Sequence, residues 1–501
     1  MRLRRRELMT AAAAAPAVLA LPGRAVPPDP VRVTPGDPRY AGLVRRGNRR
    51  FTGSPDEVWV ADTPGEVLAA VQAAVTAGRR PAVRSGGHGF EDFVDNPDVR
   101  SLIDISGLTG VTYDERLGAY AVLAGTTLGE TYRRLYLDWG VTLPGGSCPG
   151  VGTGGHVAGG GYGPLSRMHG LMADHLYAVE VVVVADGRAR TVVATREPAD
   201  PHRDLWWAHT GGGGGSFGAV TRYWFRDPPR PPASVTNFDA TWSWDGLDLV
   251  RLARNFTDWC RRYDRPGLPQ SRLYAELLLT NRAAGAVTVH GRVAGAGLID
   301  DFLGSLTAGV GVTPQVTRET LPWLQATLRD PGDDGKRWRL KTKAAYVRRP
   351  LSDEQWAVAC RSLSDPGYPN PAASMSLNTY GGAVNAVAPS ATAVARRDAA
   401  VLMFFLTAWS DPAEDARHLG WIRSLYHGMY AASGGIPVDG SYINYPDADL
   451  ADPRWNTSGR GWAEIYYGGN YARLQRVKRR YDPEDVFRHR LSVRPVSAPV
   501  S

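Results

Sequence analysis

The sequence predicts an α+β protein, and three observations lead to this fold class. Residues 58–84 have the order strand, helix, strand, and the helix begins with a recognisable cap. Residues 178–184 form an unbroken apolar run, which is typical of a strand buried on both faces. After residue 234, segments of alternating polarity are joined by a polar turn, which indicates an antiparallel sheet.

The composition is that of an ordinary globular protein with two or three domains. The chain has 501 residues, of which 43% are hydrophobic and 22% are charged. These values exclude a disordered protein and a protein with many membrane spans. The three cysteines, at positions 148, 260 and 360, are too few for a disulfide framework.

Residues 1–25 are predicted to be a signal peptide. Three consecutive arginines, at positions 4 to 6, precede an apolar run from Met9 to Leu21. The paired arginines are similar to those of a twin-arginine signal, and an ordinary secretory signal is the alternative. The apolar run has 13 residues and is too short to span a bilayer. We therefore expect a secreted protein with no membrane attachment after the signal is removed.

The basic excess of the chain belongs largely to this leader. Removing residues 1–25 takes away five arginines and one glutamate, which lowers the formal charge from +8 to +4. The rest of the sequence has no stripe of basic residues with interleaved aromatic residues, the pattern of a nucleic-acid-binding surface. We therefore expect no nucleic-acid partner.

The first half of the chain is expected to consist mostly of short strands. In the segment 58–84, Thr63 is the expected N-cap, Pro64 takes the first helical position and Glu66 completes a capping box. The further strands are expected at 101–105, 118–123, 178–184 and 190–194. The pair Asp186-Gly187 is a hairpin signal between the last two strands.

The second half begins after a proline-rich boundary at 227–233. The strands expected there are 272–279, 286–293, 374–379 and 401–408. Helical spacing is found at 247–263 and at 411–431, and the second of these helices is expected to have Asp411 as its N-cap.

The segment Arg84-Ser85-Gly86-Gly87-His88-Gly89 directly follows a predicted strand. Successive backbone N–H groups in such a turn form an anion site that suits a pyrophosphate. The glycine spacing matches neither the Rossmann pattern nor the P-loop pattern. A tight turn without a ligand is the alternative interpretation.

A second segment has ten glycines between positions 145 and 163. This density excludes the interior of a regular helix or strand and indicates close approach of the backbone to a flat or crowded partner. A metal site at Cys148 lacks the usual ligand spacing, and a Cys–His hydrolase pair lacks a third orienting residue. We therefore expect no metal and favour a large planar cofactor, with His88 and Cys148 as its reactive partners.

The two glycine segments and the C-terminal tail resemble the FAD-linked oxidases of the berberine bridge enzyme type, within the vanillyl-alcohol oxidase (PCMH) superfamily. The tail motifs that carry the resemblance are Tyr442-Ile443-Asn444-Tyr445-Pro446-Asp447, Tyr466-Tyr467-Gly468-Gly469-Asn470 and Tyr481-Asp482-Pro483. The resemblance covers nearly all of residues 35–495 and is strongest to bacterial members that tailor antibiotics.

The resemblance implies the domain organisation. A two-subdomain PCMH-type FAD-binding domain is expected at 35–228. A substrate domain, with an antiparallel sheet covered by helices, is expected at 234–440. The C-terminal berberine-bridge segment, 441–495, is expected to return to the FAD domain.

The resemblance also implies FAD as the cofactor, attached covalently at both His88 and Cys148. The other residues that it implies for cofactor binding are Arg84, Ser85, Gly86, Gly87, Gly89, Asp104, Ser106, Gly146, Val151, Gly152, Gly154, Gly155, His156, Gly160, Tyr162, Gly215, Phe217, Val220, Asn444 and Asn470. Asp485 departs from the asparagine that many relatives carry at this place.

The implied reaction is oxidation of an alcohol on a sugar or polyketide-type natural product. It needs hydride transfer to flavin N5 and a base for the hydroxyl proton. Tyr445 is the foremost candidate base, before Tyr442, Tyr162 and Tyr380. Lys341 and Lys343 are candidate neighbouring cations that would stabilise a tyrosinate.

Oxygen is expected to reoxidise the flavin and to yield hydrogen peroxide. A dehydrogenase with a different acceptor is one alternative. An exported sugar-binding protein with a degenerate flavin site is another.

Overall fold

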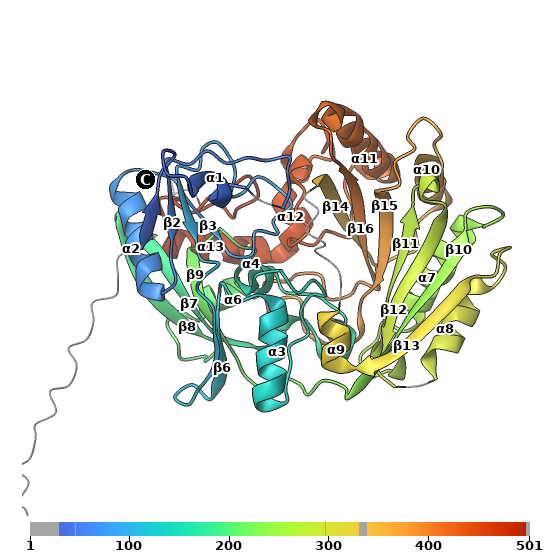
Figure 1. Cartoon of the computed structure of the whole chain (residues 1–501), viewed down its shortest axis with the longest axis horizontal. Coiled ribbons are helices and arrows are strands. Elements are labelled where there is room, and N and C mark those ends of the chain that lie inside the picture. Colours follow the sequence, from blue (N-terminus) through green and yellow to red (C-terminus); the bar gives the residue numbers. More distant parts are fainter. Residues whose placement is uncertain (1–29, 46, 296, 330–337, 497–501) are drawn as a thin grey trace, which may run out of the picture.

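The computed structural model describes residues 30–45, 47–295, 297–329 and 338–496, and these residues form three sheets with accompanying helices (Figure 1). The predicted α+β fold class is confirmed. The predicted signal peptide lies outside the described residues. In the described part of the chain, none of the helices combines the length and the apolar composition that crossing a bilayer requires.

The first sheet contains the predicted strand–helix–strand unit. Its four strands have the order β1 (Val31–Val33), β2 (Glu57–Val60), β4 (Ser101–Asp104) and β3 (Pro81–Arg84). Strands β2, β4 and β3 are parallel. Helix α2 (Pro64–Thr76) joins β2 to β3 and has the predicted capping box of Thr63 and Glu66. The first glycine turn therefore leaves the carboxyl end of a parallel strand.

The second sheet has five antiparallel strands in the order β5-β6-β9-β7-β8. Their bounds are Val111–Asp114, Ala119–Leu123, Ala219–Phe225, Leu176–Ala185 and Arg188–Thr195. The predicted hairpin joins β7 to β8, and both of its turn residues have positive φ, 53° at Asp186 and 67° at Gly187. The helices of this region are α3 (Leu128–Trp139), α4 (Thr153–Ala158), α5 (Ser166–His169) and α6 (Arg203–Ala208).

The third sheet has seven antiparallel strands in the order β13-β10-β12-β11-β15-β16-β14. Their bounds are Gln315–Pro322, Ser234–Ser243, Ala286–Val293, Leu273–Thr280, Ala373–Thr379, Val401–Trp409 and Arg339–Val347. The edge strand β13 is exposed along nearly all of its length. At the other edge, the N–H of Tyr346 in β14 donates to the carbonyl of Gly440.

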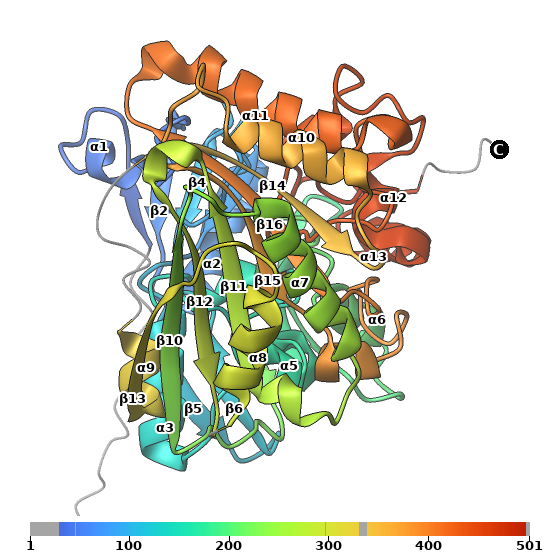
Figure 2. The same ribbon diagram turned by 90° about the vertical axis from the view of Figure 1, so that its right-hand side faces the viewer.

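Helices α7 (Leu249–Arg262), α8 (Leu298–Thr307), α10 (Asp353–Leu363) and α11 (Asp415–Met429) cover one face of the third sheet (Figure 2). Buried and half-buried residues alternate along β11, because one set of side chains packs under these helices. The other face is turned toward the first half of the chain (Figure 1).

The predicted helix at 411–431 begins later than expected. Asp411 accepts a hydrogen bond from the N–H of Ala413, but the turn that it caps is a short 3₁₀ helix, Pro412–Glu414. Helix α11 begins only at Asp415.

The C-terminal tail forms α12 (Trp462–Tyr467) and α13 (Tyr471–Tyr481). Helix α13 packs against α6 and β7, so the end of the chain lies against its first half.

Candidate active site

The two glycine-rich segments of the sequence are in backbone contact. A Cβ atom on Gly86 would lie 2.3 Å from the nitrogen of Gly152, and one on Gly152 would lie 2.1 Å from Oγ of Ser85. Only glycine at both positions permits this approach. The segments that carry His88 and Cys148 therefore meet at the start of helix α4.

A third glycine segment, 211–215, lies beside the second. A Cβ on Gly214 would be 3.7 Å from Cα of Gly155. A Cβ on Gly155 would meet no atom within 4 Å among the described residues outside its immediate chain neighbours. The exposed glycines of the three segments, here called the glycine surface, are Gly86, Gly89, Gly155, Gly214 and Gly215. This surface of bare backbone fits a large planar cofactor such as FAD.

The first glycine turn is held by neighbouring polar groups. The guanidinium of Arg84 pairs with the carboxylate of Asp104, and both side chains are buried. Asp104 also accepts a hydrogen bond of 2.8 Å from the N–H of Ser106. Oγ of Ser85 donates to the carbonyl of Ala124 at 2.7 Å. These four predicted residues thus fix the conformation of the turn that carries His88.

The second glycine segment is tied to the C-terminal tail. Nε2 of His156 accepts the N–H of Gly146 at 3.0 Å, and the carbonyl of His156 accepts Nδ2 of Asn444 at 2.8 Å. Desolvation lowers the pKa of His156 to about 4, so the ring is neutral at pH 7. A Cβ on Gly159 would lie 1.9 Å from Oδ1 of Asn444, so the asparagine rests directly on the glycine backbone.

The other predicted cofactor residues have different surroundings. The ring of Phe217 is buried and packs edge-on against His209. Val220 lies in β9, next to an irregularity in its pairing with β7. Nδ2 of Asn470 donates to the carbonyls of Pro389, Thr392 and Ala393, so this side chain holds the loop 389–393 and not the glycine surface.

The four predicted tyrosines come together in one aromatic cluster. Tyr162, Tyr380 and Tyr442 are buried in it, and Tyr445 is half-buried at its edge. The N–H of Tyr162 donates to Oη of Tyr442 at 3.1 Å, and its own hydroxyl donates to the carbonyl of Thr379. Burial raises the pKa of Tyr380 to about 12. Tyr445 is thus the one member of the four that is partly exposed.

Tyr445 is held by three aromatic rings. Its centroid lies 4.6 Å from that of Phe404, 5.2 Å from that of Tyr442 and 6.0 Å from that of Phe90. Desolvation is the largest cause that raises the pKa of Tyr445 above its ordinary value, and the charge of Glu276 raises it further. These surroundings favour the neutral phenol.

The two lysines expected to stabilise a tyrosinate lie elsewhere, so this expectation is wrong. The register of β14 and β16 places Ala344 opposite Phe404 and Lys343 opposite Phe405. Side chains alternate between the faces of a strand, so Lys341 and Lys343 share the face opposite to Phe404 and Tyr445. On that face, both lysines are buried among carboxylates.

Sequence reasoning did not identify the residues of the sheet that face the site. Phe404 contacts Tyr445, and Oη of Tyr274 donates to Oδ1 of Asn378 at 3.2 Å. Glu276 is placed opposite Asn378 on the same face. Tyr274 and Glu276 alternate with the apolar residues of the 272–279 segment, and this alternation is the signal that could have identified a solvent-facing or ligand-facing side.

The cysteines have different environments. Cys148 is half-buried in the second glycine segment. Cys260 is fully buried in α7, where desolvation raises the pKa of its thiol to about 12. Among the described residues, no group of three or more histidine, cysteine, aspartate or glutamate side chains could hold a metal ion.

The chain belongs to the berberine bridge enzyme-like family of FAD-binding oxidases. Residues 55–192 match the family described as FAD binding domain, and residues 441–494 match the family described as Berberine and berberine like. The protein is therefore an FAD-dependent oxidoreductase.

Several known proteins are similar to this chain over nearly its whole length. Aclacinomycin-N/aclacinomycin-A oxidase of Streptomyces galilaeus is 50% identical over 93% of this chain and 90% of its own length. The crystal structure of a flavoenzyme involved in shunt product recycling in caerulomycin biosynthesis has a TM-score of 0.90 and 49% identity, covering 93% of this chain and 99% of that one. A glycopeptide hexose oxidase complexed with teicoplanin has a TM-score of 0.89 and 45% identity, with the same coverage.

Proposed function

We propose that this protein oxidises an alcohol group of a sugar or polyketide-type natural product, with oxygen as the final electron acceptor and hydrogen peroxide as a product. FAD supplies the hydride acceptor when it is bound. The compounds named for the relatives support this class of substrate: one relative is an aclacinomycin oxidase, and another is a glycopeptide hexose oxidase complexed with teicoplanin.

One observation carries the proposal: the glycine surface and the tyrosine cluster are joined by Asn444. Its Nδ2 donates both to the carbonyl of His156 in the second glycine segment and to Oη of Tyr442, at 2.8 and 2.9 Å. We infer that a cofactor bound on the glycine surface would lie beside the tyrosines.

We propose that His88 and Cys148 both attach the cofactor covalently. Each lies in one of the two segments that meet at Gly86 and Gly152. An imidazole nitrogen and a thiolate are suitable nucleophiles near neutral pH. Arg84, Asp104 and Ser106 hold the turn of His88 in place.

Tyr445 is the proposed acceptor of the substrate hydroxyl proton. It is half-buried, whereas Tyr162, Tyr380 and Tyr442 are buried. Its surroundings favour the neutral phenol, so we expect proton acceptance to become easier as the pH rises. Tyr274, Glu276 and Asn378 are proposed to contact the polar groups of the substrate from the sheet.

The test is a screen of sugars and glycosylated antibiotics with detection of peroxide under air. Peroxide formation with a member of this class is the expected result. If the protein reduces a dye acceptor and forms no peroxide, it is a dehydrogenase and not an oxidase. A purified protein without flavin would indicate a binding protein instead.

We also propose that the protein is exported in a folded state through a twin-arginine signal at residues 1–25. The covalent attachment of FAD proposed above is consistent with this route, because FAD is made inside the cell.

A further inference from the structure

A largely buried group of charged side chains, here called the ionic clamp, includes the two lysines that lie on the face of the third sheet opposite to Phe404. Its members are Glu91, Lys341, Lys343, Arg423, Asp447 and Asp449. Three are cations and three are anions, so the clamp is balanced in charge. None of its residues has a role in the chemistry proposed above.

Asp447 is the centre of the clamp. One of its carboxylate oxygens lies 2.7 Å from Nζ of Lys341, and the other lies 2.7 Å from Nζ of Lys343. The exposed fraction of the side chain is 0% for Asp447, 2% for Lys341 and 3% for Lys343. Burial opposes the charge of Lys341, but Asp447, Glu91 and Asp449 outweigh it and raise the pKa of the ammonium group.

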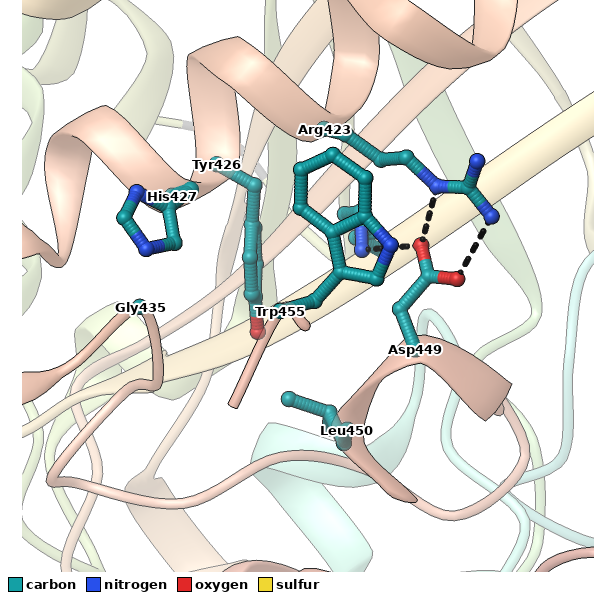
Figure 3. Close-up of a pocket in the computed structure, with 8 residues that line it drawn as sticks. Arg423, Tyr426, His427, Gly435, Asp449, Leu450 and Trp455 are labelled. Atoms are coloured by element: carbon teal, nitrogen blue, oxygen red, sulfur yellow. Dashed lines mark hydrogen bonds and ion pairs between the residues drawn. The ribbon is translucent and has the colours of Figure 1, made fainter. Parts of the chain in front are cut away.

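Two further contacts extend the clamp to Glu91 and to Arg423. Glu91 pairs with Lys341 and accepts the N–H of Ala448 at 3.1 Å. Nε and Nη2 of Arg423 donate to the two oxygens of Asp449 at 3.0 and 2.8 Å, beside the ring of Trp455 (Figure 3). A two-pronged pair of this kind fixes orientation as well as distance.

The clamp therefore joins four parts of the chain that are distant in sequence. Glu91 follows the glycine turn of His88, and the lysines belong to β14. Arg423 belongs to α11, and the two aspartates belong to the tail. These parts include the segment that carries the proposed covalent histidine and the segment that carries Tyr445.

The clamp is linked to Tyr445 from two sides. Asp447 follows Tyr445 by two residues, so the backbone of the proposed base is anchored by the two lysines. Phe90, the neighbour of Glu91, packs against the ring of Tyr445 with a centroid distance of 6.0 Å. Movement of the clamp must displace the ring, its backbone or both.

We propose that the ionic clamp positions Tyr445 for proton transfer, with Asp447 as the decisive positioning residue. The proposal rests on the proposed function, in which Tyr445 accepts the substrate proton. The clamp does not touch the reacting atoms: it acts only by fixing the place of the tyrosine.

The test is a double-mutant cycle on flavin reduction by substrate without oxygen. Asp447→Asn keeps the shape of the side chain and removes its charge, and we expect about 100-fold slower reduction, since small misplacements have effects of this size. In the Tyr445→Phe background, the same change should slow reduction by less than about 3-fold, because interacting sites are not additive. Equal losses in the two backgrounds would overturn the proposal.

Glu57→Gln is the matched control. Glu57 is also a buried carboxylate held by two cations, Arg32 at 2.8 Å and Arg79 at 3.1 Å. It lies at the start of β2, whereas the glycine turn follows the carboxyl end of β3. The variant should lower the thermal midpoint and keep the parent rate of flavin reduction. If Glu57→Gln slows reduction as much as Asp447→Asn, general destabilisation explains the loss and positioning is rejected.

A second variant removes a cation and an anion together, in case Asp447→Asn does not fold. Lys343→Met with Asp449→Asn leaves two cations and two anions, so the charge balance is kept. The same non-additivity with Tyr445→Phe is expected, and full additivity would overturn the proposal.

Hydrogen exchange tests the clamp independently of the proposed role of Tyr445 as a base. If Tyr445→Phe alone reduces flavin at the parent rate, the role of Tyr445 as a base is wrong. Exchange of the amides at 441–449 then tests the clamp by itself. Asp447→Asn should accelerate it at least about 10-fold relative to Glu57→Gln, and equal exchange in the two variants would overturn the clamp.

Discussion

Gly86 and Gly152 are in backbone contact, and a Cβ atom on Gly86 would lie 2.3 Å from the nitrogen of Gly152. The same contact fixes the segments of His88 and Cys148 against each other. The proposed attachment of one cofactor at both residues therefore depends on glycine at positions 86 and 152, where no larger side chain fits.

Gly152→Ala should separate the two segments. The new methyl group would collide with the nitrogen of Gly86 and with Oγ of Ser85. We expect a protein with strongly reduced flavin content, measured as the ratio of absorbance at the flavin and protein bands, and a lower thermal midpoint. Gly420→Ala in α11 is the control, since its Cβ meets nothing within 4 Å in the described structure. It should leave flavin content unchanged, with stability equal or higher by up to about 1 kcal/mol. Full flavin content in Gly152→Ala contradicts the prediction.

Covalent attachment at two residues predicts that neither single variant releases its flavin. His88→Ala and Cys148→Ala should each stay yellow after acid denaturation, and the double variant should lose FAD on gel filtration in denaturant. Peptide mass mapping of the parent protein should place flavin on both residues. Release of FAD from the denatured parent protein would refute both links.

Tyr445→Phe should keep its flavin, since neither of the two residues proposed to attach it is changed. Removal of a general base typically slows a reaction by about 10²–10⁴-fold. The loss should appear in flavin reduction by substrate, and reoxidation by oxygen should be nearly unchanged. In the parent enzyme, reduction should become faster as the pH rises, because the pKa of Tyr445 is raised and the fraction of tyrosinate grows with pH.

A parent rate of reduction in Tyr445→Phe would place the base elsewhere. Tyr442, Tyr162 and Tyr380 would then be tested in this order.

Three desolvated histidines, of which His209 and His489 are buried and His156 is half-buried, predict that stability falls in mild acid. Desolvation lowers the pKa to about 4 in His156 and His209 and to about 3 in His489. Unfolding restores a value near 6.5, so between about pH 6.5 and 4 the unfolded chain binds protons that the folded chain excludes. The free energy of unfolding should fall by about 1.4 kcal/mol per pH unit for each histidine as the pH drops through this window.

Denaturant unfolding at pH 7, 6 and 5 measures this slope. His209→Asn keeps a donor for the carbonyl of Leu205 and should reduce the slope by about one third of the total for the three histidines. Equal stability at pH 7 and pH 5 would rule out the effect.

Replacing Arg5 and Arg6 by lysine should trap folded, yellow protein inside the cell. Immunoblots of cells and medium, together with flavin fluorescence of the gel band, measure the outcome. Undiminished secretion of the variant would favour an ordinary secretory signal.

Local patterns predicted a good part of the fold. The capping box of Thr63 and Glu66 and the Asp186-Gly187 turn depend on a few neighbouring residues, and both are present. Strand β13 was not predicted, because its residues are exposed on both faces and show no alternation. Helix α3 (Leu128–Trp139) was also missed, although Thr127 caps it.

The parts of the candidate site that lie within short sequence motifs could be predicted from the sequence. The glycine segments could be found because their glycine density is unusual. Tyr445 was a candidate only through the resemblance of the tail to a known family. The role of Lys341 and Lys343 could not be found, since their partners Asp447 and Asp449 lie more than 100 residues away in the sequence. The position of Phe404 beside Tyr445 likewise depends on strand register, which single strands do not specify.

Strand β13 ends the seven-stranded sheet, and within the described residues it pairs only with β10. An edge strand presents unpaired backbone N–H and C=O groups to other chains, and pairing with them can lead to aggregation. Here Arg318 is paired with Asp300, Glu319 with Arg329, and Pro322 closes the strand. A strand of another chain that paired with β13 would have to desolvate these two ion pairs. It would also find no N–H donor at Pro322. The charged residues of this edge strand thus oppose self-association at high protein concentration. Replacing Arg318 and Glu319 by valine should make concentrated solutions form fibrous precipitates.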